Sequence, residues 1–247
     1  MTDFHAVGIV LAAYGFAGFV KGTVGLGLPT VTLALLVPSI GLAPAVALTV
    51  VPTFVTNAWQ ALSGGHFRVI VRRLWPLLLT ATIGTLVGTG LLAALDPGKL
   101  SLLLGTLLVL YGAYGLVAPP LPAPGRLEAL LSPLVGFVAG VMAGMVGAFL
   151  MPGIIYLQAL RLPREELIQT LGIIFFVLSI ALGSGLASNN LLPRDLVALS
   201  AVSVLPALAG MELGRRFRRH LSEQRFRKVF FCALIALGAN IAWRGLQ

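Results

Sequence analysis

One apolar run, Leu74 to Leu95, limits the fold of this chain more than any other stretch. It contains no charged side chain, and as a helix it would be about 33 Å long, close to the roughly 30 Å hydrocarbon thickness of a bilayer. A transmembrane strand needs only about 10 residues of alternating polarity. Charged residues make up 10% of the 247 residues, against roughly 25% in soluble domains. We therefore predict an all-α polytopic membrane protein whose backbone groups bond within helices.

Apolar segments recur in the same order in the two halves of the chain. Each half is predicted to hold one long segment, one short piece and three further long segments, which gives about eight spans. The segments lie at residues 4–20, 29–37, 43–62, 74–95 and 100–117 in the first half, and at 127–146, 150–160, 165–188, 196–216 and 226–243 in the second. We expect membrane repeats at 1–118 and 127–247, joined by a proline-rich linker at 119–126.

Glycines at fixed offsets indicate that the second half is a copy of the first. Gly22 and Gly25 recur 122 positions later as Gly144 and Gly147. Three further glycines recur 126 positions later: Gly84, Gly88 and Gly112 return as Gly210, Gly214 and Gly238. Offsets that stay near half the chain length are typical of an internal duplication.

Basic loops give the two halves opposite orientations. In the first half, loop 63–73 carries three arginines, whereas 96–99 is neutral. In the second half the corresponding loops swap, because 189–195 is neutral and 212–228 carries seven basic residues against two glutamates. Basic loops face the cytoplasm, so we predict inverted repeats in a cell inner or plasma membrane.

The same loops carry all but one unit of the net charge of +9. Because the basic residues lie in short loops between apolar runs, we expect no nucleic-acid partner. We expect anionic lipid to bind at loops 63–73 and 212–228, and a homo-oligomer stays open. The start of the chain has no basic region, so no cleaved signal peptide is expected.

Two glycine-rich stretches, Lys21 to Pro29 and Gly144 to Pro152, break their apolar segments. We predict that each segment and the short piece after it form a hairpin; the alternative is one long broken helix per half. A half-helix that begins inside a membrane binds anions through its free N–H groups and partial positive charge. The candidate anion-binding residues are Lys21, Gly22, Gly25, Gly27, Pro29, Gly144, Gly147 and Pro152. Close helix packing is the alternative for the glycines, and reaching to a membrane interface is the alternative for Lys21.

Segment 43–62 carries a polar stripe. Its members are Thr49, Thr53, Thr56, Asn57 and Gln60, which share one helical face. A polar face inside a membrane turns toward protein or water. We therefore name Thr49 and Asn57 as candidate substrate-binding residues, together with Gln169 and Thr170 at the corresponding place in the second half. Hydrogen bonding between helices is the alternative.

Catalytic and metal-binding patterns are missing from the sequence. No paired carboxylates lie in an apolar run, and His5, His66 and His220 have no ligand spacing. Cys232 is the single cysteine, which excludes a disulfide within one chain. We therefore expect no enzyme activity, no cofactor and no metal site.

The glycine pattern resembles the sulfite exporter TauE/SafE family over almost the whole chain. The resemblance is carried by Gly18 to Pro29, by Gly136 to Gly140 running into Gly144, Gly147 and Pro152, and by the pairs Gly84/Gly88 and Gly210/Gly214. It implies about seven or eight spans and export of sulfite or organosulfonates. The alternatives are a proton-coupled transporter of another small anion, such as a carboxylate or thiosulfate, and a non-transporting membrane scaffold.

Overall fold

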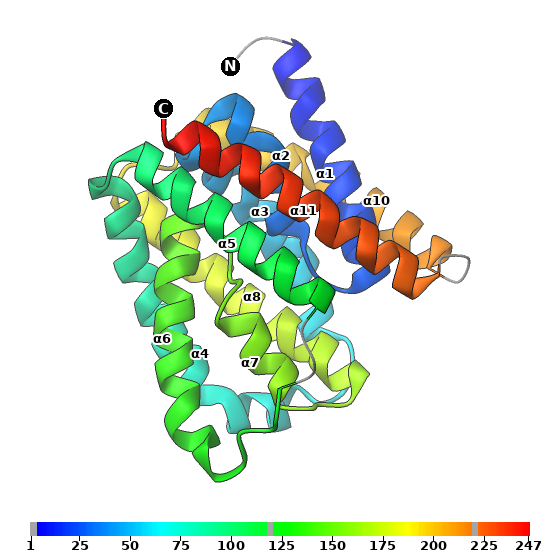
Figure 1. Ribbon diagram of the computed structural model, residues 1–247. Coiled ribbons are helices and arrows are strands. Elements are labelled where there is room, and N and C mark those ends of the chain that lie inside the picture. Colours follow the sequence, from blue (N-terminus) through cyan, green and yellow to red (C-terminus); the bar gives the residue numbers. More distant parts are fainter. Residues whose placement is uncertain (1–3, 118–120, 219–221) are drawn as a thin grey trace. The chain divides into compact units, whose positions relative to one another are not determined.

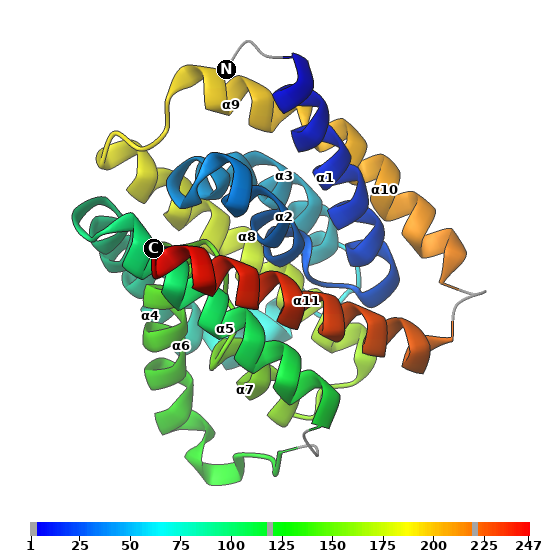
Figure 2. The same ribbon diagram turned by 45° about the horizontal axis from the view of Figure 1, so that its top comes forward.

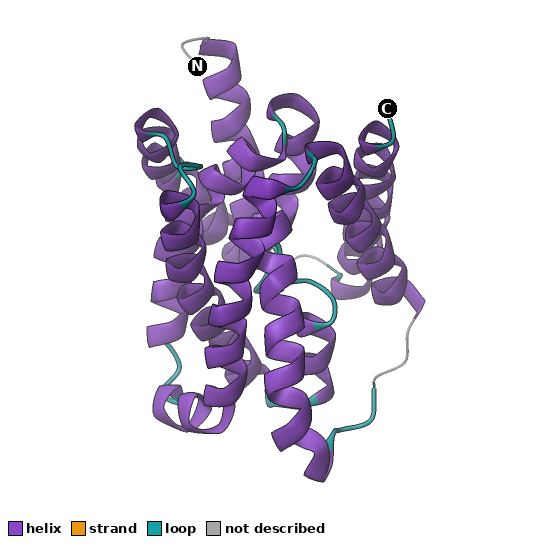
Figure 3. Cartoon of the chain, turned by 90° about the vertical axis from the view of Figure 1, so that its left-hand side faces the viewer, coloured by secondary structure: helices purple, strands orange, loops and turns teal. Residues whose placement is uncertain are grey.

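The protein is a bundle of helices, and strands are absent from residues 4–117, 121–218 and 222–247, which the computed structural model describes (Figure 3). Eight helical segments of this part of the chain are long and apolar enough to cross a membrane. The prediction of an all-α multi-pass membrane protein with about eight spans is confirmed. The helices are α1 (Phe4–Val24), α2 (Leu28–Ile40), α3 (Leu42–Leu62), α4 (Phe67–Ala94), α5 (Pro97–Val117), α6 (Glu128–Val146), α7 (Gly153–Ala159), α8 (Arg164–Ser188), α9 (Arg194–Val202), α10 (Val204–Phe217) and α11 (Glu223–Gly245).

Three boundaries differ from the apolar runs. Helix α2 continues through Pro38 and ends before Gly41, which has a φ of 82°. Helix α4 begins at Phe67, so loop 63–73 is partly helical. The single segment expected at 196–216 is two helices that meet at Ser203. Pro206 explains this break, because it has no N–H for the carbonyl of Val202, whereas a proline is tolerated in the first turn of α10.

The chain divides into two compact units that do not coincide with its halves. Unit 1 comprises residues 1–52, 96–118 and 192–247, and unit 2 comprises 53–95 and 119–191. Each unit therefore contains segments from both predicted repeats. The linker predicted at 119–126 lies partly outside the described residues; it includes the start of a short 3₁₀ turn, Gly125–Leu127.

In unit 1, α1 packs against α10 with the two backbones in contact (Figures 1 and 2). A Cβ atom added to any of four glycines would overlap a backbone carbonyl of the facing helix. The contacts join Gly18 with Ala207, Gly22 with Met211, Gly210 with Gly15 and Gly214 with Phe19. They advance in the same direction along both helices, so α1 and α10 are parallel.

In unit 2, α4 packs against α6 in the same manner. The contacts join Gly140 with Ala81, Gly144 with Thr85, Gly84 with Phe137 and Gly88 with Val141. These are the contacts of unit 1 moved by the two offsets found in the sequence, 122 positions for α1 to α6 and 126 positions for α4 to α10. The matched contacts support the predicted duplication.

Corresponding helices of the two halves run antiparallel where they pack within one unit. In unit 1, Gly98 of α5 lies at Gly245 of α11, and Gly112 lies at Phe231. In unit 2, Gln60 of α3 bonds to Ile168 of α8, and the rings of Phe54 and Phe176 are 5.1 Å apart. Antiparallel counterparts are what inverted repeats require, so both pairs are consistent with the predicted inversion.

The glycine contacts predict a sharp difference between two neighbouring positions of α4. Gly88→Ala should lower the thermal unfolding midpoint in detergent, because its Cβ meets the Val141 carbonyl and overpacking costs about 1–3 kcal/mol. Gly90 has nothing within 4 Å of an added Cβ, so Gly90→Ala should leave the midpoint unchanged or raise it. Equal losses in the two variants would contradict this role of Gly88.

Candidate functional site

The first glycine-rich stretch forms a tight turn between α1 and α2. Gly25 and Gly27 have φ angles of 90° and 103°, a left-handed conformation that glycine adopts without strain. The Gly25 N–H donates to the Lys21 carbonyl at 2.7 Å, and the Gly27 carbonyl accepts from Val31 at 2.9 Å. Pro29 lies in the first turn of α2, where its missing N–H removes no helical bond.

The second stretch ends α6 in the same way and then turns back. Gly147 has a φ of 73°, and its N–H donates to Ala143 at 2.8 Å, matching the bond between Gly25 and Lys21. After Pro152 the chain enters α7, where the Tyr156 hydroxyl lies 2.6 Å from the hydroxyl of Ser132. Because Ser132 is near the start of α6, the segment returns along the helix that precedes it. The hairpin expected for this half is present in unit 2.

Lys21 is a buried lysine in the last turn of α1. Its exposed fraction is 4%, so its side chain does not run along the outer surface, as a lysine that reaches a membrane interface would. The neighbouring Gly22 packs against Met211 and Arg215 of α10. Lys21 is therefore buried near the basic end of α10 rather than near the middle of the span Arg194–Phe217.

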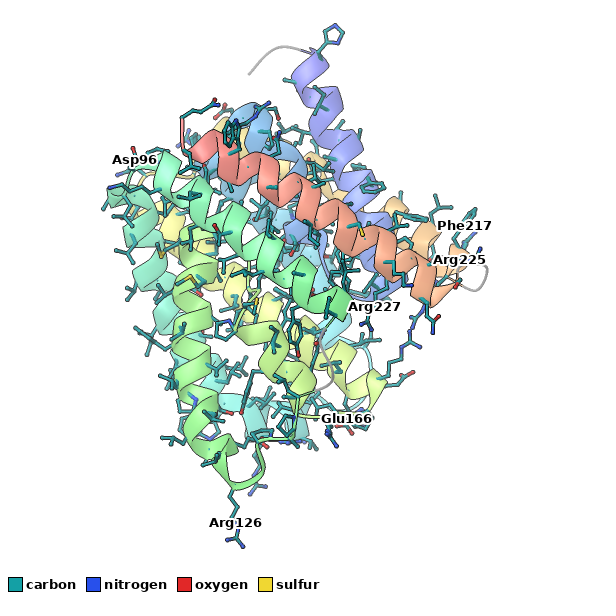
Figure 4. The ribbon with its side chains drawn as sticks, viewed as in Figure 1. Asp96, Arg126, Glu166, Phe217, Arg225 and Arg227 are labelled. Carbon is teal, nitrogen blue, oxygen red and sulfur yellow. The ribbon has the colours of Figure 1, made fainter. Side chains whose placement is uncertain are left out.

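That end of unit 1 is rich in cations. Figure 4 shows Phe217 at the end of α10, with Arg225 and Arg227 at the start of α11. Arg227 donates to the carbonyl of Gly115 at 2.9 Å and thereby caps the last turn of α5. Arg225 and Arg227 are exposed, so this end of the unit presents positive charge at its surface.

The glycines named from the sequence have two different structural roles. Gly22 and Gly144 lie inside helices and face the backbones of α10 and α4, which agrees with the close-packing alternative. Gly25, Gly27 and Gly147 have positive φ and form the turns. Binding of an anion by any of these backbones stays a prediction.

The polar stripe of α3 is buried, and most of its hydrogen bonds are local. Thr49 and Asn57 are 1% and 2% exposed. The Asn57 amide donates to the Thr53 carbonyl at 2.8 Å, and Gln60 joins α3 to α8. The Thr53 hydroxyl is buried with no hydrogen-bond partner among the described residues. The stripe thus joins helices at Gln60 and leaves one hydroxyl at Thr53 available.

The two candidates on α8 differ in whether their side chains already make hydrogen bonds. Gln169 is buried, donates to the Ala61 carbonyl at 2.8 Å and accepts from the His66 N–H at 2.9 Å. Its amide therefore holds the connection between α3 and α4. Thr170 is fully buried, and its hydroxyl lacks a partner in the described part of the chain.

The candidate residues fall into both units. Unit 1 contains Lys21, Gly22, Gly25, Gly27, Pro29 and Thr49, and unit 2 contains Asn57, Gly144, Gly147, Pro152, Gln169 and Thr170. Among the described residues, no three His, Cys, Asp or Glu side chains are grouped so that they could hold a metal ion.

Sequence reasoning missed two interactions of unit 2 that hold α6 to its neighbours α7 and α4. One is the bond between Tyr156 and Ser132; the other is a two-pronged ion pair in which Arg73 donates to both oxygens of Glu128 at 2.6 and 2.7 Å. The Tyr156 hydroxyl also donates to the Glu128 carbonyl at 3.4 Å. Arg73 and Glu128 are far apart in the chain, so no local sequence pattern predicts their pairing.

Comparison with known proteins identifies the family. The sequence model of one family, described as sulfite exporter TauE/SafE, matches residues 10–241. The chain belongs to the sulfite exporter TauE/SafE family. A curated member from Cupriavidus necator, named probable sulfite/organosulfonate exporter TauE, is 26% identical over 236 residues, which cover 93% of this chain and 91% of the relative. No solved structure matches the chain.

The capping bonds of Gln169 predict a role in stability for this family member. Gln169→Leu removes the bonds to Ala61 and His66, and each buried group left without a partner should cost about 1–3 kcal/mol. Gln158→Leu, a change of the same type at an exposed side chain of α7, should have little effect. Thermal unfolding of both variants in detergent measures this, and a Gln169 variant as stable as the Gln158 variant would refute the capping role.

Proposed function

We propose that the protein exports a small sulfur oxyanion, sulfite or an organosulfonate, across an inner or plasma membrane. The observation that carries this proposal is the family match over residues 10–241, supported by the name of the Cupriavidus relative. The absence of a catalytic pattern in the sequence supports transport rather than an enzymatic reaction.

The substrate site is proposed to lie at the turn between α1 and α2. Lys21 supplies a buried positive charge, and the start of α2 supplies backbone N–H groups and the positive end of a helix dipole. Gly25 and Gly27 let the backbone turn without a side chain in the way. The counterpart turn from Gly147 to Pro152 is proposed to bind an anion through its backbone as well, but without a lysine.

Polar side chains of α3 and α8 are proposed to bind the anion within their own units. Thr49 and Asn57 are the candidates on α3. On α8, Thr170 is the stronger candidate because its buried hydroxyl has no partner in the described residues, whereas Gln169 would have to give up a bond to Ala61 or His66.

Transport is proposed to occur by alternating exposure of this site, with loops 63–73 and 212–228 in the cytoplasm. Moving one negative charge out of a negative cell interior releases about 2.3 kcal/mol per 100 mV, so the membrane potential by itself favours export. The basic loops would then face the anionic lipids of the cytoplasmic leaflet. Assembly into a homo-oligomer is compatible with this mechanism.

The lysine can be tested by sulfite efflux from proteoliposomes. Lys21→Met keeps much of the side-chain volume and removes the charge, and the initial rate should fall about tenfold or more, because a hydrogen bond to a charged group contributes about 1.5–3 kcal/mol. Lys99→Met changes an exposed lysine in the first turn of α5. It is the matched control and should transport normally. Equal rates for the two variants would remove Lys21 from the mechanism.

The substrate class can be tested by voltage and competition in the same liposomes. Sulfite or organosulfonate efflux should rise when the compartment that the anion leaves is made negative, and unlabelled sulfite should compete better than a carboxylate or thiosulfate. Efflux that follows a pH gradient and ignores voltage would favour the proton-coupled alternative.

A further inference from the structure

One helix continues through the boundary between the two compact units. The chain passes from one unit to the other after residues 52, 95, 118 and 191. The crossings after 95 and 191 lie in connections between helices, and the crossing after 118 falls outside the described residues. The crossing after Pro52 lies inside α3. Any movement between the units must therefore be absorbed by the helical backbone at this position.

Pro52 removes one helical hydrogen bond at this crossing. Its nitrogen carries no hydrogen, so it cannot donate to the Leu48 carbonyl four positions earlier. The carbonyl is instead bonded by the hydroxyl of Ser200, which donates to it at 2.7 Å. The same hydroxyl accepts from the Val51 N–H at 3.3 Å. Ser200 belongs to α9 of unit 1 and is fully buried.

This arrangement suits a bend whose angle changes. A helical bond at residue 52 would resist bending, whereas proline excludes that bond in every conformation. A hydroxyl can rotate and keep its donor and acceptor bonds while the angle between two helical turns changes. The counterpart helix α8 contains no proline, so the break is particular to α3.

We propose that α3 bends at Pro52 when the two units move during transport, and that Ser200 is the positioning residue that holds the unit 1 side of this hinge. The inference rests on the proposed transport function. Thr49 precedes the hinge and Asn57 follows it on the polar stripe, so bending changes how these two candidate side chains are directed relative to one another.

Distances between spin labels on the two units test the hinge. The single native cysteine, Cys232 of unit 1, is exposed, and Ser184→Cys adds an exposed site on α8 of unit 2. Pro52→Ala should narrow the distance distribution in lipid nanodiscs. In proteoliposomes it should lower sulfite efflux about tenfold, a change that corresponds to about 1.4 kcal/mol. Pro76→Ala, at a proline inside α4 of unit 2, is the matched control and should change neither.

Ser200 variants separate a positioning role from simple packing. Ser200→Ala leaves the Leu48 carbonyl without its donor, so it should shift the distance distribution and lower the thermal midpoint, whereas Ser200→Thr should preserve both. In the Pro52→Ala background the new N–H at residue 52 bonds to Leu48, and Ser200→Ala should then have no effect. An equal effect in both backgrounds would overturn the role of Ser200.

The outcomes distinguish the hinge from the proposed substrate. If the unmodified chain carries no sulfite but Pro52→Ala still narrows the distribution, the hinge stands and the substrate is wrong. If Pro52→Ala matches the unmodified chain in distances and in efflux, the hinge is wrong and the proposed export stands.

Discussion

Direct contact between helix backbones is the interaction on which the rest of this structure depends. Lipid tails are as apolar as leucine side chains, so helices in a membrane gain little from burying apolar surface and rely on close packing. In unit 1, α1 packs against α10, and in unit 2, α6 packs against α4. In both pairs, glycines of each helix face the backbone of the other. An added methyl group at any of these glycines would overlap a carbonyl oxygen, so the spacing between the helices depends on the absence of side chains.

This packing also fixes where each glycine turn can lie. Gly22 and Gly144 hold the last turns of α1 and α6 against their neighbours, and the chain reverses within a few residues, at Gly25 and Gly147. Packing and turning are thus separate tasks of adjacent glycines. The distinction matters for function because the turn glycines have left-handed backbones outside the helical hydrogen-bond pattern, whereas Gly22 and Gly144 face another helix.

The spans and the turns were predictable because they follow from local rules. Long apolar runs become helices in lipid, and glycine before a proline interrupts them. The break at Ser203 was missed, although Pro206 predicts it, because proline has no N–H to donate to the carbonyl of Val202. The roles of Gln169 and of the pair formed by Arg73 and Glu128 could not be predicted, because each joins segments far apart in sequence. Ser200 lies between these cases: Pro52 predicts a carbonyl in need of a donor, and only the fold shows which residue supplies it.

The two halves have different residues at several corresponding positions, and these differences bear on function. Two conformations related by exchanging identical halves would be equal in energy, so a preference between them has to come from residues that differ. In unit 2 the hydroxyls of Ser132 and Tyr156 bond to each other, whereas the corresponding Val10 and Leu33 of unit 1 are apolar and buried. Lys21 of unit 1 corresponds to Ala143. A polar bond joins the two arms of the α6–α7 hairpin, whereas the turn between α1 and α2 follows a buried lysine, so the two turns differ in their polar interactions. Any preference between such conformations therefore has to come from differences of this kind, and Lys21 is where the proposed anion site differs most from its counterpart.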